Sequence, residues 1–168
     1  MRSEKIIMAI ALARWNIDEY HQMIATGLLE ERHLELLQGD IVEMPPEGPE
    51  HAYLGTRTDK YLTRLLGDRA EVRQSHPITL SDHSEPEPDI AIVRPLGGEY
   101  RYRHPNAEEV FWLIEYANTS LAKDTDIKRK IYAENGIPEY WIADLQQHRL
   151  LIFRNPQSQE LTAKSSGL

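Results

Sequence analysis

The pattern of apolar and polar positions near the start of the chain predicts a short helix followed by a hairpin. In "NIDEYHQMIATG", Asn16 is placed to cap a helix, Glu19 follows three residues later, and Gly27 supplies a stop. Two apolar-rich runs in "LELLQGDIVEM" flank Gly39, which provides the positive φ that a tight turn needs.

The middle of the chain predicts one long helix and three strands. After the break "PPEGP", residues 49–66 carry Leu54, Tyr61, Leu62, Leu65 and Leu66, an amphipathic pattern that ends at Gly67. The segments "AEVRQ" and "PITL", interrupted by Pro77, predict the first strand. "DIAIV" predicts the second, and "VFWLIEY" is apolar enough to be central in a sheet.

The last third predicts a helix and a final hairpin. Residues 124–135 form a helical pattern ended by Gly136, and Pro138 then forces an extended entry into "EYWIAD", which pairs with "RLLIFR". From residue 49 the order is α, β, β, β, α, β. We therefore expect an α/β fold whose central mixed sheet is covered by helices on both faces, with an extra N-terminal helix and hairpin.

Length and composition indicate one domain in a reducing compartment. The 168 residues contain no cysteine, which fits the cytoplasm and excludes a thiolate zinc site. We predict an N-terminal extension over 1–14, a single domain over 15–155 and a polar, disordered tail over 156–168. The apolar run 6–13 is too short to span a membrane, and Arg14 and Trp15 follow it at once, so an extension is favoured over a signal peptide.

The net charge of −8 argues against binding to nucleic acid through bulk positive charge. Basic residues do cluster around Arg101 and around Lys128, although such clusters are more often solvated faces than phosphate contacts.

Two carboxylates are candidates for metal chemistry. Asp89 opens the second predicted strand and Glu115 lies near the end of the third, so they meet at one sheet edge if these strands are neighbours. A buried carboxylate is costly unless it is paired, protonated or bound to metal. The sequence leaves open whether Glu115 binds a metal or only meets an arginine at the strand end.

Lys128 is expected to point toward the sheet. Ile127, Ile131 and Tyr132 define an inward stripe at helical spacing, and Lys128 lies on that arc. The alternatives are that its chain runs past the core to water, or that it pairs with Asp124 one turn earlier.

Two further residues have weaker functional signals. Glu35 alternates with leucines in the predicted hairpin, which is typical of a solvent-facing position. His51 falls in the first turn of the helix over 49–66, where a histidine is usually a surface or capping residue. No phosphate-binding glycine loop, nucleophile elbow or zinc spacing of histidines is present in the sequence.

The segments "HLELLQGDIVEMPPEGPEH", "EPEPDIAIV", "LIEYANTSLAKDTDIKRKIYAENGIPEYWIAD" and "LLIFR" resemble, in order and spacing, the Uma-type family of restriction-endonuclease-like proteins. That family is similar to the PD-(D/E)XK nuclease superfamily. The most specific part is "GIPEYWIAD" preceded by Asp124, Lys128 and Tyr132 at four-residue steps.

The resemblance implies a restriction-endonuclease-like fold and metal-dependent phosphodiester hydrolysis. It makes Asp89 and Glu115 the motif acids, and Glu35 the early glutamate. The usual motif lysine would fall at Ala117, and the resemblance implies that Lys128 from the following helix replaces it. His51 matches a histidine frequent in the family, without an assigned role.

These observations lead to a main hypothesis and two alternatives. The main one is an endonuclease that uses Mg²⁺ or Mn²⁺ to cleave DNA, with Asp89 and Glu115 as metal ligands, Lys128 stabilising negative charge and Glu35 completing the site. One alternative is a catalytically inactive nuclease-like module that binds nucleic acid or regulates a partner. The other is a structural oligomer, and a homodimer is compatible with every reading.

Overall fold

The computed structural model describes residues 12–155 and 164–167. Its α-helices are α1 (Ile17–Ala25), α2 (Pro49–Leu66), α3 (Leu121–Lys123) and α4 (Arg129–Glu134). The strands are β1 (Leu34–Leu37), β2 (Asp40–Glu43), β3 (Glu71–Gln74), β4 (Ile90–Val93), β5 (Val110–Ala117), β6 (Glu139–Asp144), β7 (Arg149–Arg154) and β8 (Lys164–Gly167). Short turns of helix are η1 (Gly67–Arg69), η2 (Gly97–Arg101), η3 (Ala107–Glu109) and the π-helical η4 (Asp124–Lys128).

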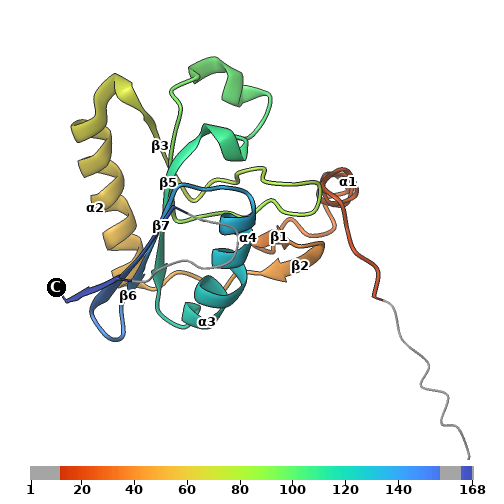
Figure 1. Cartoon of the computed structure of the whole chain (residues 1–168). Helices are drawn as coiled ribbons and strands as arrows, with labels where there is room; N and C mark the ends of the chain where they lie inside the picture. Colours follow the sequence, from red (N-terminus) through yellow and green to blue (C-terminus); the bar gives the residue numbers. More distant parts are fainter. Residues whose placement is uncertain (1–11, 156–163, 168) are drawn as a thin grey trace, which may run out of the picture.

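A six-stranded mixed sheet in the order β3-β4-β5-β6-β7-β8 forms the centre of the molecule (Figure 1). All neighbouring strands are antiparallel except β5 and β6, which are parallel. β5 is the longest strand and lies inside the sheet, because its "VFWLIEYA" run can be buried on both faces. The predicted α/β class, the mixed sheet and the final hairpin of β6 and β7 are confirmed.

Helices cover both faces of the sheet, as the sequence predicts (Figure 1). Leu62 of α2 packs on one face against Ile90 and Ile114, whereas Ile131 and Tyr132 of α4 pack on the other. The fold thus places the N-terminus of α2 and the segment α3–η4–α4 on opposite sides of the same strands.

The predicted N-terminal helix and hairpin are also present. Asn16 and Glu19 form a reciprocal capping box at the start of α1, and Gly39 adopts a φ of 81° between β1 and β2. Backbone hydrogen bonds in both directions between Leu36 and Glu85 attach the hairpin to the segment that precedes β4.

The prediction that "PITL" continues the first strand is wrong. Ser75 has a φ of 50°, which turns the chain after Gln74, and Pro77 lacks the N–H that a ladder requires. Ile78 is still fully buried, so the apolar pattern marks a core contact outside a strand.

The apolar stripe predicted for residues 49–66 is too wide. The helix has the predicted bounds, but Tyr61 and Leu65 are 62% and 53% exposed. Leu62 is buried, with Leu54 and Leu66 packed beside it, because the sheet surface accommodates only this narrower row.

The helix predicted over 124–135 begins earlier and contains an irregular turn. It runs from Leu121 to Glu134 through the π-helical segment η4, in which Arg129 donates its backbone N–H to the carbonyl of Asp124. The wider π turn rotates Ile127 outward to 42% exposure, so its assignment to the inward stripe is wrong.

At the ends of the chain the structure describes only part of what was predicted. The expected extension falls mostly on residues 1–11, outside the described residues. Disorder was expected after residue 155, but Lys164–Gly167 pair with β7 as β8. Over the described ranges, none of the helices has the length and apolar character of a membrane span.

Candidate active site

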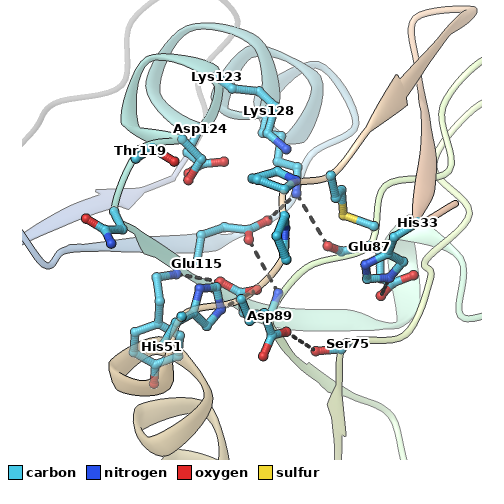
Figure 2. A pocket seen from close by; sticks show the side chains of 18 residues that line it. His33, His51, Ser75, Glu87, Asp89, Glu115, Thr119, Lys123, Asp124 and Lys128 are labelled. Atoms are coloured by element: carbon cyan, nitrogen blue, oxygen red, sulfur yellow. Dashed lines mark hydrogen bonds and ion pairs between the residues drawn. The ribbon is translucent and has the colours of Figure 1, made fainter.

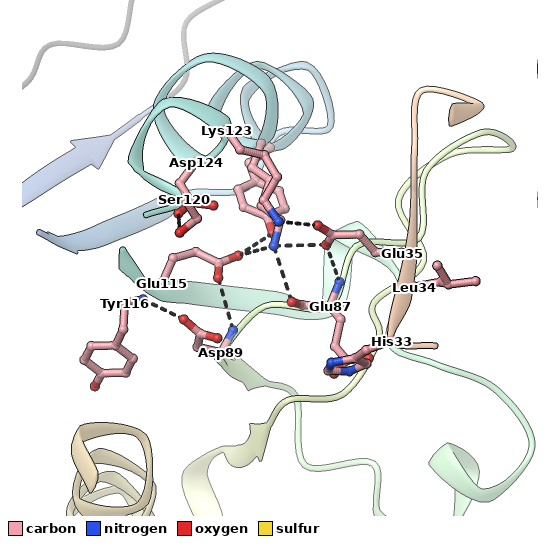
Figure 3. A network of polar contacts seen from close by, with 12 residues as sticks. His33, Leu34, Glu35, Glu87, Asp89, Glu115, Tyr116, Ser120, Lys123 and Asp124 are labelled. Carbon is pink, nitrogen blue, oxygen red and sulfur yellow. Dashed lines mark hydrogen bonds and ion pairs between the residues drawn. The ribbon is translucent and has the colours of Figure 1, made fainter. Parts of the chain in front are cut away.

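Asp89 and Glu115 lie side by side at one edge of the sheet because β4 and β5 are neighbours. The register pairs Ile90 with Ile114, which sets the preceding Asp89 opposite Glu115. The Asp89 backbone N–H donates to Oε2 of Glu115 at 3.4 Å, and the Tyr116 N–H donates to Oδ2 of Asp89 at 2.6 Å (Figure 3). The strand ladder therefore fixes the position of both carboxylates.

Lys128 reaches this edge from η4 and is 2% exposed. Its Nζ lies 2.8 Å from Oε1 of Glu115 and donates to the carbonyl of Glu87 at 3.4 Å (Figure 2). The same Nζ lies 3.0 Å from Oε2 of Glu35. Tyr132, one turn later, donates its hydroxyl to Oε1 of Glu115 at 3.1 Å. The structure thus brings Asp89, Glu115, Lys128, Glu35 and Tyr132 into one network.

Burial and neighbouring charges shift the protonation equilibria of this network. Burial favours neutral Lys128, but Glu115 and Glu35 outweigh it and raise the pKa of the Lys128 ammonium well above its usual value. Burial also opposes ionisation of Glu35, whose pKa is nevertheless lowered by Lys128 and Lys123. Burial, with the charges of Asp89 and Asp124, raises the pKa of Glu115 against the opposing effect of Lys128. Negative charge around Glu115 is therefore only partly compensated.

A second face of Asp89 meets α2. Oδ1 of Asp89 lies 3.0 Å from Nε2 of His51, although the contact is poorly directed and leaves this buried nitrogen without a hydrogen bond. The Asp89 carboxylate raises the pKa of His51. Glu47, His51 and Asp89 each place a candidate ligand atom within 4.8 Å of the others.

A cavity lies between the N-terminus of α2, the loop before it, and α3, and its lining includes His51, Asp89, Glu115 and Lys128 (Figure 2). Glu35 and Tyr132 are not among its lining residues. Glu47, Lys123 and Asp124 line the cavity as well, although the sequence did not mark them as site residues. The four-residue step from Asp124 to Lys128 was a usable signal for Asp124. Glu47 sits in the "PPEGP" break and Lys123 in a charged run, where nothing distinguishes a site residue from a solvated one.

Two sequence interpretations are corrected here. The alternation in β1 indicated a solvent-facing Glu35, yet this residue is 1% exposed because α3 and η4 cover that side of the hairpin with Lys123 and Lys128. The side chain of Lys128 does not extend to water, because the residue is 2% exposed. It does not pair with Asp124 either, which instead accepts a hydrogen bond from Ser120 at 2.6 Å. The expected inward direction of Lys128 is confirmed.

Comparison with known proteins identifies the family. A family model described as "Putative restriction endonuclease", Uma2, matches residues 17–167. The chain belongs to the Uma2 family. No curated protein matches it significantly.

The fold of this Uma2 protein also occurs in a solved structure. A crystal structure described as "a putative nuclease belonging to DUF820", from Anabaena variabilis, has a TM-score of 0.67 and 18% sequence identity. The alignment covers 89% of this chain and 84% of that chain. At this identity the comparison shows the fold, which is restriction-endonuclease-like.

The donors at the site of the Uma2 protein fit a divalent cation. Oδ2 of Asp89 accepts a short backbone hydrogen bond, and Oε1 of Glu115 accepts hydrogen bonds from Lys128 and Tyr132. The other two oxygens, Oδ1 of Asp89 and Oε2 of Glu115, are therefore more available to a cation, since Oε2 accepts only a 3.4 Å backbone contact. Carboxylate oxygens suit Mg²⁺ and Mn²⁺, and an imidazole nitrogen such as Nε2 of His51, 3.0 Å from Oδ1 of Asp89, also suits Mn²⁺.

Proposed function

We propose that this protein is a metal-dependent endonuclease that hydrolyses phosphodiester bonds in DNA, with Mg²⁺ or Mn²⁺ as cofactor. The observation that carries the proposal is the convergence of Asp89 and Glu115 from adjacent strands beside the buried ammonium of Lys128. DNA as substrate is supported by the description of the Uma2 family as a restriction endonuclease.

Asp89 and Glu115 would hold the cation. Glu47 and His51 place candidate ligand atoms within 4.8 Å of that of Asp89, so they could contribute from the side of Asp89 that faces α2. A divalent cation at this position would lower the pKa of a bound water and neutralise charge on the scissile phosphate. Lys128 lowers the pKa of Glu35 and opposes the rise that burial imposes on the pKa of Glu115. Tyr132 donates a hydrogen bond to Oε1 of Glu115 and so helps to fix its rotamer. The protein itself therefore supplies a prearranged, partly compensated set of carboxylates.

The test compares cleavage of supercoiled plasmid and single-stranded DNA by the wild type and Asp89→Asn, in Mg²⁺, in Mn²⁺ and in a chelator. Asp89→Asn preserves shape but weakens a ligand, so we expect metal-dependent cleavage in the wild type and a loss of at least about 10²-fold in the variant. Asp68→Asn, at an exposed position in η1 just after α2, is the matched control and should cleave as the wild type does. Equal cleavage by wild type and Asp89→Asn would point to a contaminating nuclease and overturn the proposal.

One observation favours a second function, a nuclease-like module that binds nucleic acid without cleaving it. Ala117 occupies the usual lysine position, and the ammonium of Lys128 is enclosed by protein acceptors. Under this alternative the wild type binds DNA but leaves every substrate intact in both metals. Titration calorimetry with Mn²⁺ separates the two functions further, because only the nuclease requires a bound cation.

A further inference from the structure

Two lysines reach the candidate site from the same helical segment, and their surroundings differ. Lys128 has three N–H donors, and the three acceptors around it are Glu35, Glu115 and the carbonyl of Glu87. Because the residue is also 2% exposed, a substrate phosphate can contact it only if one of these interactions breaks.

Lys123 is the more accessible of the two. Its side chain is 19% exposed and lines the cavity. Among contacts between described residues, its Nζ has the 2.8 Å pair with Oε1 of Glu35, which leaves two donors for another acceptor. Glu35 binds Lys123 through Oε1 (Figure 3). It binds Lys128 through Oε2 and so holds the two lysines as a pair.

The π turn explains why both lysines face the site. They are five residues apart, and in a regular α-helix that spacing would separate their directions by about 140°. η4 has the i to i+5 hydrogen-bonding pattern, so residues five apart lie roughly one turn from each other. The irregular turn thus directs Lys123 to the side on which Lys128 is buried.

We infer that Lys123, rather than Lys128, contacts the scissile phosphate of the nucleic acid. This inference rests on the proposed function. Lys128 is then a positioning residue that fixes Glu115 and Glu35, while Lys123 donates to a non-bridging phosphate oxygen and stabilises the charge that develops there. Glu35 holds the Lys123 ammonium at the cavity until the phosphate arrives.

The first part of the test measures binding of a short DNA duplex with Ca²⁺ in place of the catalytic cation, over a range of NaCl concentrations. Affinity for DNA falls as salt rises, and loss of one phosphate contact reduces the magnitude of the slope of log affinity against log salt by about 1. We expect this decrease for Lys123→Gln and no decrease for Lys130→Gln, an exposed lysine on α4. Glu35→Gln breaks the ion pair but keeps the Lys123 ammonium, so the wild-type slope should remain.

The second part measures single-turnover cleavage in Mg²⁺ and affinity for Mn²⁺. Lys123→Gln should cleave about 10²-fold more slowly while binding Mn²⁺ at least as tightly as the wild type, and Lys123→Arg should recover part of the rate. Provided that the wild type cleaves DNA, two results would overturn the inference. One is a Lys123→Gln variant with the salt slope and the cleavage rate of the wild type. The other is a Lys123→Gln variant that loses Mn²⁺ binding as well as cleavage, because the lysine would then act on the metal site and not on the phosphate. A wild type that neither binds Mn²⁺ nor cleaves DNA would overturn the proposed function as well.

Discussion

The central residue of the buried network is Lys128, because it compensates two carboxylates at once. Glu35 and Glu115 are 1% and 4% exposed, and neither could remain ionised in the core without a nearby cation. The network therefore couples stability of the fold to the geometry of the site.

This coupling gives a prediction for Lys128→Met, which keeps the length of the side chain and removes its charge. Leaving buried carboxylates uncompensated should lower the free energy of unfolding by about 3–5 kcal/mol, measured by urea denaturation. Adding Glu115→Gln removes one of those charges, so the double variant should lose less stability than the two single losses added together. Simple additivity would show that the two side chains do not interact energetically.

The sequence predicted some of these residues for physical reasons and missed others. Glu115 follows an apolar run, and a carboxylate there signals an unusual environment. Glu35 has no such signal, because alternation in a hairpin strand cannot show that a distant helix covers its polar side. Glu47 and Lys123 lie in polar segments, so only the folded structure separates them from solvated residues.

Among the elements, the helical segment Leu121–Glu134 departs most from its sequence pattern. Ile127, Ile131 and Tyr132 fit a regular helix, and the pattern contains no sign of the extra residue in η4. By contrast its end was predictable. Gly136 adopts a φ of 72°, a conformation that glycine reaches without a steric penalty.

Gly136→Ala tests that conformational requirement. An added Cβ would meet no heavy atom within 4 Å, so the backbone strain acts alone and should cost about 1 kcal/mol of unfolding free energy. Gly98→Ala, with equally open surroundings and no positive φ, is the control and should change stability by less than about 0.5 kcal/mol. Equal stabilities of the two variants would mean that the turn relaxes at no cost.

A second element-level prediction concerns the ion pair that ties the η2 region to the start of β5. Arg103 donates to both oxygens of Glu109 at 2.6 Å, and this contact lowers the pKa of Glu109 below its usual 4.5. A lowered folded-state pKa contributes stability that is present above that usual value and is lost as the pH falls through the folded pKa. Arg103→Met should therefore destabilise the protein more near pH 6.5 than near pH 3 in thermal unfolding. A loss of stability independent of pH would assign the effect to the packing of Arg103 on Tyr100 instead.

At the scale of the whole molecule, the layer order was predictable because β5 is too apolar to lie at a sheet edge and two amphipathic helices must cover it. The path of the chain between β3 and β4 was not predictable, since Ile78 is buried without belonging to a strand.

Assembly as a homodimer and a cytoplasmic location stay predictions. The net charge of −8 also acquires a local meaning, because part of it lies in carboxylates that converge on one cavity.

The most direct test of the account is anomalous diffraction from crystals soaked in Mn²⁺. We predict a peak between the carboxylates of Asp89 and Glu115, within coordination distance of both, that disappears in Asp89→Asn. Crystals in which Mn²⁺ binds elsewhere, or which show no peak at this edge of the sheet at saturating metal, would contradict it.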